Sequence, residues 1–455
     1  MRRDRGYLLL EEPNLYRAFL LLALPVFGAN FMKAFNDLVD TFFIGQMANS
    51  VAAQAGVSIA WPLLNIFAAF QAGLGIAGVA VISQRLGAKD RPAARRYSGL
   101  LVLLSASFGF ALNLLLWLLC PAVMRLMGAE GQVLACAVEY TRIRSFELLF
   151  TLIFFAFQAI RQAQGDTSTP VLLSVGAVLL NIALTALFVQ GMGMGVAGAA
   201  LATVLGQAAI FPLCLYLLFR PGESLQLRAA DLRFAWQPVR RLAQVAAPAA
   251  LSQALSSLGF LVLQALILDY GQVVTAAFSI GNKISNMLLM PVLALGSVLA
   301  AYVGQNVGAG NPGRARQAYL VSRNIGLLVA VLGSLLLLPL IQQLVALLTN
   351  DAATHAAAAE YMLWVLLTQP LMSLFQNYLG VFNGSGNTGY SFLISTARLW
   401  LVRLPLILAF KHFTPLGRQG IWYAMVISNF VIVVFAALLF RRVGLGKQAQ
   451  PAAPG

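Results

Sequence analysis

Stretches of about 20 mainly apolar residues, the length one helix needs to cross a bilayer, alternate with short polar segments along almost the whole chain. We therefore predict twelve membrane-spanning helices, six in each half. Their expected centres lie near Phe27, Ile66, Phe108, Phe150, Val178, Gly206, Gln253, Met290, Val331, Thr368, Trp400 and Val431.

The polar junctions of the first half recur in the second. Residues 84–88 (QRLGA) match residues 305–309 (QNVGA), and residues 165–167 (GDT) match residues 386–388 (GNT), both at an offset of 221 positions. An even number of spans per copy brings both copies into the membrane in the same orientation. We expect an all-α integral membrane protein with two six-helix bundles related by a pseudo-two-fold axis along the membrane normal. This organisation is typical of transporters.

A basic segment containing prolines separates the two halves. It can form either a helix at the cytoplasmic interface or a solvated linker. The predicted domains are an N-terminal lobe at residues 1–219, a cytoplasmic linker at 220–241, a C-terminal lobe at 242–442 and a disordered tail at 443–455.

Composition supports the membrane assignment, because 60% of residues are hydrophobic and only 10% are charged. The chain has 30 Lys and Arg against 15 Asp and Glu, which could suggest nucleic-acid binding. The basic residues instead gather in alternate connections, as in 85–96, 220–241 and 441–447, while the intervening connections are mostly uncharged or acidic. This positive-inside distribution predicts a multi-pass protein of the inner (cytoplasmic) membrane, surrounded by lipid, with both termini in the cytoplasm and no nucleic-acid partner.

The sequence offers little for enzymatic chemistry. Its three cysteines lie in or beside apolar spans, and its two histidines have no nearby Cys or carboxylate cluster in the sequence. No nucleotide-binding loop or nucleophile–base pair is evident. We therefore expect neither an enzyme nor a cofactor or metal site, and energy for uphill transport would come from an ion gradient.

The first span contains the most informative polar residues. Lys33 and Asp37 are four positions apart and can pair on one helical face, as can Asn36 and Asp40. Asp40 has no evident cationic partner, and burial would raise the pKa of such a carboxyl into a range where it can carry a proton. Pro25 removes a backbone hydrogen bond and predicts a kink in the same helix. Asp40 could alternatively lie at the outer interface.

These features resemble the multidrug and toxic compound extrusion (MATE) transporters over nearly the entire chain. The resemblance rests on Pro25 with residues 39–41 (VDT), on the junction at 84–88, on residues 164–167 (QGDT), on Asn181 and on residues 195–200 (GVAGAA). It implies two six-helix bundles around a cavity and the export of organic cations or other amphiphiles in exchange for H⁺ or Na⁺. Within the family, the DNA-damage-inducible protein F branch is the most similar.

The resemblance also implies an ion-coupling site in the N-terminal lobe. Asp40 and Asn181 match family positions, Thr203 fits as a polar ligand, and Asn36 shares the face of Asp40. Many members carry a second aspartate where this chain has Thr185. One negative charge is therefore missing, which favours H⁺ over Na⁺, with Na⁺ at Asp40 and Asn181 as the alternative.

We therefore predict a secondary active multidrug exporter that works by alternating access and exchanges protons for its cargo. We expect its cargo to be cationic or amphiphilic small molecules and the functional unit to be a monomer. A Na⁺-coupled antiporter and a lipid-linked saccharide flippase are the alternatives. The candidate cavity residues are the polar or polarisable side chains within the spans, each of which could equally serve in packing. They are Asp37, Asn65, Gln253, Gln264, Asn282, Asn286, Met287, Met290, Gln369 and Asn377.

Overall fold

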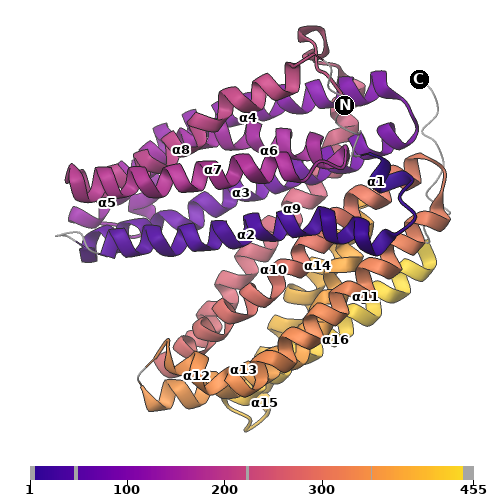
Figure 1. Ribbon diagram of the computed structural model, residues 1–455. Helices are drawn as coiled ribbons and strands as arrows, with labels where there is room; N and C mark the ends of the chain where they lie inside the picture. Colours follow the sequence, from indigo (N-terminus) through magenta and orange to yellow (C-terminus); the bar gives the residue numbers. More distant parts are fainter. Residues whose placement is uncertain (1–5, 46–49, 222–224, 350, 444–455) are drawn as a thin grey trace. The chain divides into compact units, whose positions relative to one another are not determined.

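The computed structural model describes residues 6–45, 50–221, 225–349 and 351–443. These parts are helical and contain no strand (Figure 1). A helix satisfies its own backbone hydrogen bonds, as a segment in hydrocarbon must. Within helices α2 (Leu15–Gly45) and α3 (Ser50–Gly87), the structure describes only the backbone of some residues. They are residues 37, 38, 40–42, 44, 45, 50–54, 61, 62 and 66.

The chain forms two compact units. Unit 1 comprises Met1–Leu8 and Gly28–Ala250, and unit 2 comprises Leu9–Phe27 and Leu251–Gly455. The elements up to the end of the first repeat are α1 (Tyr7–Leu10), α2 (Leu15–Gly45), α3 (Ser50–Gly87), α4 (Arg91–Leu126), α5 (Gly131–Ser145), α6 (Glu147–Ala163), α7 (Ser168–Thr185), the π-helical η1 (Ala186–Gly191) and α8 (Gly195–Phe219).

The remaining elements follow a short connection. They are the 3₁₀ turn η2 (Ala229–Asp231), α9 (Trp236–Leu268), α10 (Gln272–Gly308), α11 (Pro312–Leu337), the 3₁₀ turn η3 (Leu338–Leu340), α12 (Ile341–Ala346), α13 (Ala352–Gly384), α14 (Thr388–Thr396), the π-helical η4 (Ala397–Arg403), α15 (Leu404–Phe413) and α16 (Arg418–Val443).

Within the described ranges, ten helices are long and apolar enough to cross a membrane. Helices α5 and α6, bent by 41° at their junction, form an eleventh span when taken together. Helix α13, with 33 residues, occupies the position of the span expected near Thr368. The sequence predicted one span near Phe150, and the bent pair occupies this region of the structure.

The repeated junctions have the same backbone structure in both copies. Asp90 caps α4 by accepting a hydrogen bond from the Ala93 amide at 3.1 Å, and Asn311 caps α11 by accepting one from the Arg314 amide at 3.1 Å. A side-chain oxygen at this position satisfies an amide that the helix itself leaves unpaired. The shared cap explains why Asp and Asn occupy equivalent positions 221 residues apart.

The second pair of landmarks ends α6 and α13. Gly165 and Gly386 have φ angles of +79° and +76°, a region that glycine enters without a steric penalty. The amides that follow, of Asp166 and Asn387, each donate at 2.9 Å to a carbonyl five residues earlier. The preserved spacing therefore reflects one turn geometry used twice.

Helices α2 and α9 each belong to both units. Helix α2 begins in unit 2 and continues in unit 1 after Phe27, whereas α9 begins in unit 1 and continues in unit 2 after Ala250. Pro25 and Pro248 each lie three residues before the point at which their helix enters the next unit. The predicted lobes, which place all residues before 220 in the first lobe, do not include this exchange.

The segment before Gly28 is held within unit 2 by specific contacts. The Asn306 amide donates to the Leu9 carbonyl at 3.0 Å, and the rings of Phe19 and Tyr302 stack with centroids 4.8 Å apart. Both aromatic side chains are fully buried. Stacked aromatic pairs add to the stabilisation from burial, so the first half of α2 is firmly anchored on α10.

The described part of the connection, from Leu225 to Ala235, forms no extended interfacial helix. It packs on unit 1, where Leu225 and Leu227 are buried and the Leu227 amide donates to the Leu218 carbonyl at 2.9 Å. The only helical turn between Leu225 and Trp236 is η2. The tail at residues 444–455 lies outside the described residues, so its predicted disorder stays a prediction.

Candidate functional site

Two of the predicted ion-site residues meet between α7 and α8 in unit 1. The Asn181 amide donates to the Thr203 hydroxyl at 3.1 Å, and both side chains are buried. Gly206 permits the close approach of the two helices, because a Cβ there would lie 2.9 Å from the Ala177 carbonyl oxygen. The small residue in α8 thus places Asn181 beside Thr203.

Arg144, which the sequence analysis did not single out, joins this group. Its Nη1 donates to the Thr203 hydroxyl at 3.2 Å, and its Nε lies 2.9 Å from an Oε of Glu147. Arg144 and Glu147 are three residues apart across the α5–α6 junction. The sequence does contain a signal for Arg144, because Arg144 and Glu147 form a charged pair within a predicted span. Their closeness to Thr203, however, follows only from the bend between α5 and α6.

The Thr203 hydroxyl has its full set of hydrogen bonds. It accepts from Asn181 and Arg144 and donates to the Ala199 carbonyl at 3.1 Å. A hydroxyl has one donor and two acceptor positions, so no lone pair remains for a cation in this arrangement.

Two neutral oxygens near this network have unused hydrogen-bonding capacity. The Oδ1 of Asn181 and the Oγ1 of Thr185 are buried and have no hydrogen-bond partner among the groups that the structure describes. Thr185 is completely buried. A buried oxygen without a partner is costly and marks a place where a water molecule or another polar group can bind.

The remaining predicted coupling residues lie on α2. The side chains of Asp37 and Asp40 are outside the described residues, so their proposed roles stay predictions. Asn36 is half-buried. Pro25 lies inside an uninterrupted helix, so the chain continues through the predicted kink position without a break in helical structure.

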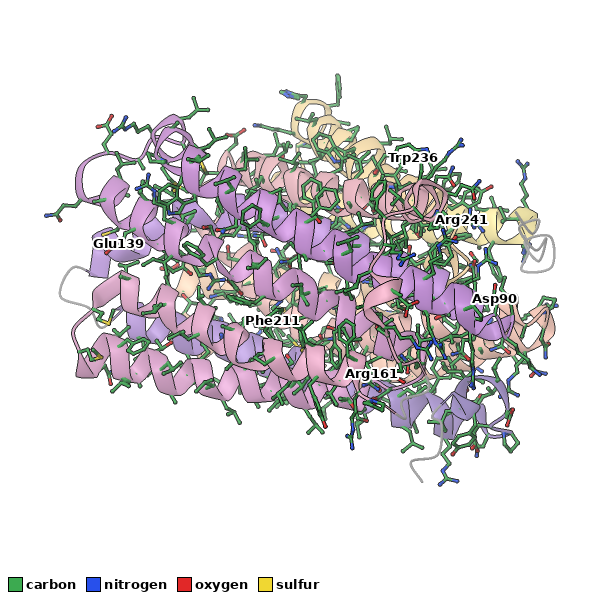
Figure 2. All side chains as sticks on the ribbon, turned by 90° about the horizontal axis from the view of Figure 1, so that it is seen from above. Asp90, Glu139, Arg161, Phe211, Trp236 and Arg241 are labelled. Carbon is green, nitrogen blue, oxygen red and sulfur yellow. The ribbon has the colours of Figure 1, made fainter. Side chains whose placement is uncertain are left out.

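Figure 2 shows Asp90, Arg161 and Arg241 toward one end of unit 1 and Glu139 toward the opposite end. Arg161 donates to the Leu217 carbonyl at 2.8 Å, so it also ties α6 to α8. Among the described residues, no group of three or more His, Cys, Asp or Glu side chains is placed to hold a metal ion.

The candidate cavity residues separate into accessible and buried groups. Gln253, Gln264, Asn286 and Met287 are exposed, and Asn65, Asn282 and Met290 are half-buried. Asn286, Met287 and Met290 follow a spacing that puts them on one face of α10. This accessible face remains a candidate for contact with substrate.

Gln369 and Asn377 instead form hydrogen bonds between helices of unit 2. Gln369 donates to Ser285 at 3.0 Å, and Asn377 accepts from Ser322 at 2.6 Å. Both are buried. Polar bonds of this kind help to join helices within a membrane. Gln369 and Asn377 therefore serve in helix packing in this structure. Their contact with substrate stays a prediction.

The pattern that defines the MatE family matches this chain twice, at residues 25–187 and at residues 248–408. The two matches cover most of the sequence, one in each repeat. The chain belongs to the MATE family. It is accordingly a multi-pass membrane transporter, as the sequence predicted. The assignment to the DNA-damage-inducible protein F branch stays a prediction.

Relatives of this MATE protein match along almost their full length. The probable multidrug resistance protein YoeA of Bacillus subtilis is 24% identical over 90% of each chain. The FAD transporter of Shewanella oneidensis is 28% identical over 94% of each chain. The crystal structure of MATE in complex with MaD3S has the same fold, with a TM-score of 0.92, 22% identity and coverage of 98% of this chain and 99% of that one. The likeness confirms the predicted twelve-helix, two-bundle fold class.

Proposed function

We propose that this protein exports amphiphilic organic compounds, cationic ones among them, in exchange for protons, by alternating access. Family membership and the multidrug-resistance relatives support export of drug-like molecules. The observation that favours protons is the saturated Thr203 hydroxyl in the network of unit 1.

Sodium is a hard cation that prefers several oxygen ligands, as other hard cations do in proteins. Thr203 has no lone pair available for such a ligand role, because its hydroxyl already bonds to Asn181, Arg144 and the Ala199 carbonyl. A proton needs only one titratable group, so the network favours proton coupling over sodium coupling.

Asp40 is the proposed proton carrier. Its helix, α2, belongs to unit 1 along the stretch that contains this residue. A carboxyl is a titratable group, so it can gain and lose a proton during a transport cycle. Protonation from outside after substrate release, and deprotonation when substrate binds, would then link proton entry to export.

Replacing Asp40 with Asn tests this role. The variant keeps the shape and polarity of the side chain but cannot titrate, so we expect at least a tenfold loss of pH-driven ethidium transport in proteoliposomes. The thermal unfolding midpoint should match that of the wild type, which shows that the protein is folded. Wild-type transport by the variant would refute the assignment. Transport driven by a sodium gradient at equal pH on both sides would favour the sodium alternative.

Export of a flavin dinucleotide is the second candidate. It rests on the match to the FAD transporter along 94% of both chains. Proteoliposomes loaded with FAD distinguish this candidate from drug export. Release of FAD driven by a pH gradient, without transport of ethidium, would favour flavin export. Transport of ethidium without release of FAD would favour drug export.

A further inference from the structure

Two arginines lie in the interior of unit 2, within the π-helical segment η4. Arg398 is 9% exposed and Arg403 is 5% exposed. A π-helix forms hydrogen bonds between residues five apart, so these two residues occupy successive turns of one segment. An arginine within a membrane span is costly and usually lies near a partner or a cavity.

The acids of the second half do not supply that partner. Residues 251–455 contain only Asp269, Asp351 and Glu360. Asp269 lies 2.8 Å from the Lys411 ammonium, and Glu360 lies 2.8 Å from the Arg418 guanidinium. Asp351 caps α13 through a hydrogen bond from a backbone amide. Each of the three therefore has a role outside η4.

The other acids assigned to unit 2 are Glu11 and Glu12, which precede α2. The Glu12 carbonyl accepts a hydrogen bond from Arg314 at 2.7 Å, which places this segment at the start of α11. The described contacts of Arg398 and Arg403 are to other helices, α13 and α16.

Neutral groups hold Arg403. Its Nε donates to the Ser428 hydroxyl at 3.0 Å, and its Nη2 donates to the side-chain Oδ1 of Asn429 at 2.7 Å. These bonds from α16 fix the guanidinium, and no acidic side chain among the described residues of unit 2 pairs with it. Arg403 therefore contributes to a positive potential along η4 while its own side chain is immobilised.

Arg398 is held less completely. Its Nη1 lies 3.2 Å from the sulfur of Met372, a weak acceptor, and its Cζ lies 4.6 Å from the ring centre of Phe375. Its buried Nε has no hydrogen-bond partner among the described groups. The aromatic face stabilises the cation without using its donors. Arg398 thus combines a fixed position with an unused donor in a site of low polarity.

We propose that Arg398 binds the anionic group, a carboxylate or phosphate ester, of an amphiphilic molecule, and that Arg403 positions this end through its charge. A guanidinium binds such groups through charge-assisted hydrogen bonds, which strengthen where water is scarce. The inference rests on the proposed export function and adds molecules with an anionic group, zwitterions included, to its cargo. Lys283, exposed on α10 and without an ion pair among the described residues, adds another positive charge to unit 2.

Riboflavin and flavin mononucleotide provide a matched test, because they differ only by a phosphate ester. Binding is measured by flavin fluorescence with the full-length protein in nanodiscs of neutral phosphatidylcholine. We expect the wild type to bind the mononucleotide at least tenfold more tightly than riboflavin. Arg398→Gln should reduce this preference to less than threefold and leave riboflavin affinity unchanged. Arg398→Lys, which keeps the charge, should retain part of the preference.

Arg441→Gln is the matched control, since Arg441 is exposed at the end of α16 and should leave the preference unchanged. A loss as large as that of Arg398→Gln would overturn the proposal. So would equal binding of the two flavins by the wild type, a result that does not depend on any variant folding. Retention of the full preference in folded Arg398→Gln would also overturn it.

A second arm separates cargo from lipid as the source of the anion. If a lipid headgroup occupies the site, phosphatidylglycerol in the nanodiscs should weaken binding of the mononucleotide to the wild type but not to Arg398→Gln. If phosphatidylglycerol does not weaken this binding, the site is assigned to cargo. Both results support an anion site. Ethidium binding without any flavin binding would overturn the inference but leave drug export standing, whereas absence of binding by all three probes would count against the proposed function itself.

Discussion

At the scale of single residues, one backbone position with a positive φ is occupied by different residue types in the two repeats. Lys89 has a φ of +60° and is the one described residue other than glycine with a positive φ. Its counterpart 221 positions later, Gly310, has a φ of +70°. A side chain in this region costs about 1–2 kcal/mol, so the first repeat stores strain that the second avoids.

Lys89→Gly should therefore stabilise the protein by up to about 1 kcal/mol, because relief of the strain exceeds the added freedom of the unfolded chain. The thermal unfolding midpoint in detergent measures the change. The reciprocal variant, Gly310→Lys, should lower the midpoint. A rise for Gly310→Lys, or a fall for Lys89→Gly, would contradict the comparison of the repeats.

The candidate ion site shows what residue patterns could and could not predict. Asn181 and Thr203 were both expected at this site, and they are in contact in unit 1. Arg144 was not expected there, because its contact with Thr203 joins residues 59 positions apart through the bend between α5 and α6. That contact depends on the fold and could not be derived from residue type.

At the scale of elements, α10 and α13 pack through small residues. A Cβ on Gly380 would lie 2.7 Å from the Gly296 carbonyl oxygen, and one on Gly384 would meet the Ala300 carbonyl oxygen. Small residues let helix backbones approach closely, which is how helices associate where lipid is as apolar as their side chains. The close contact then allows Gln369 to reach Ser285 across the same pair.

Gly380→Ala should destabilise unit 2 by about 1–3 kcal/mol, because the new methyl group requires the two backbones to separate. A lower thermal midpoint in detergent would show the effect. Gly389→Ala is the matched control on α14, where an added Cβ meets no atom within 4 Å. It should leave the midpoint unchanged or raise it slightly, since alanine favours a helix. Similar shifts in the two variants would argue against the packing explanation.

Whole-molecule orientation follows from the distribution of charge and remains a prediction. Ala88, beside the repeated junction, should face the cytoplasm, and Ala353, at the start of α13, should face outside. Both are exposed in the structure. The three native cysteines would first be replaced. A membrane-impermeant maleimide added to intact cells should then label Ala353→Cys but not Ala88→Cys, and labelling of both after lysis confirms that each is reactive. The reverse pattern in intact cells would place the termini outside.

The sequence by itself determined the membrane class, the positions of the spans and the repeated junctions. Apolar length, helix caps and glycine turns act locally, so they can be recognised from neighbouring residues. Only the tertiary structure decided that α2 and α9 are shared between the units, that Arg144 reaches Thr203 and that Arg398 lies buried against Met372 and Phe375. These features depend on contacts between distant segments, whose distances and burial no local pattern specifies.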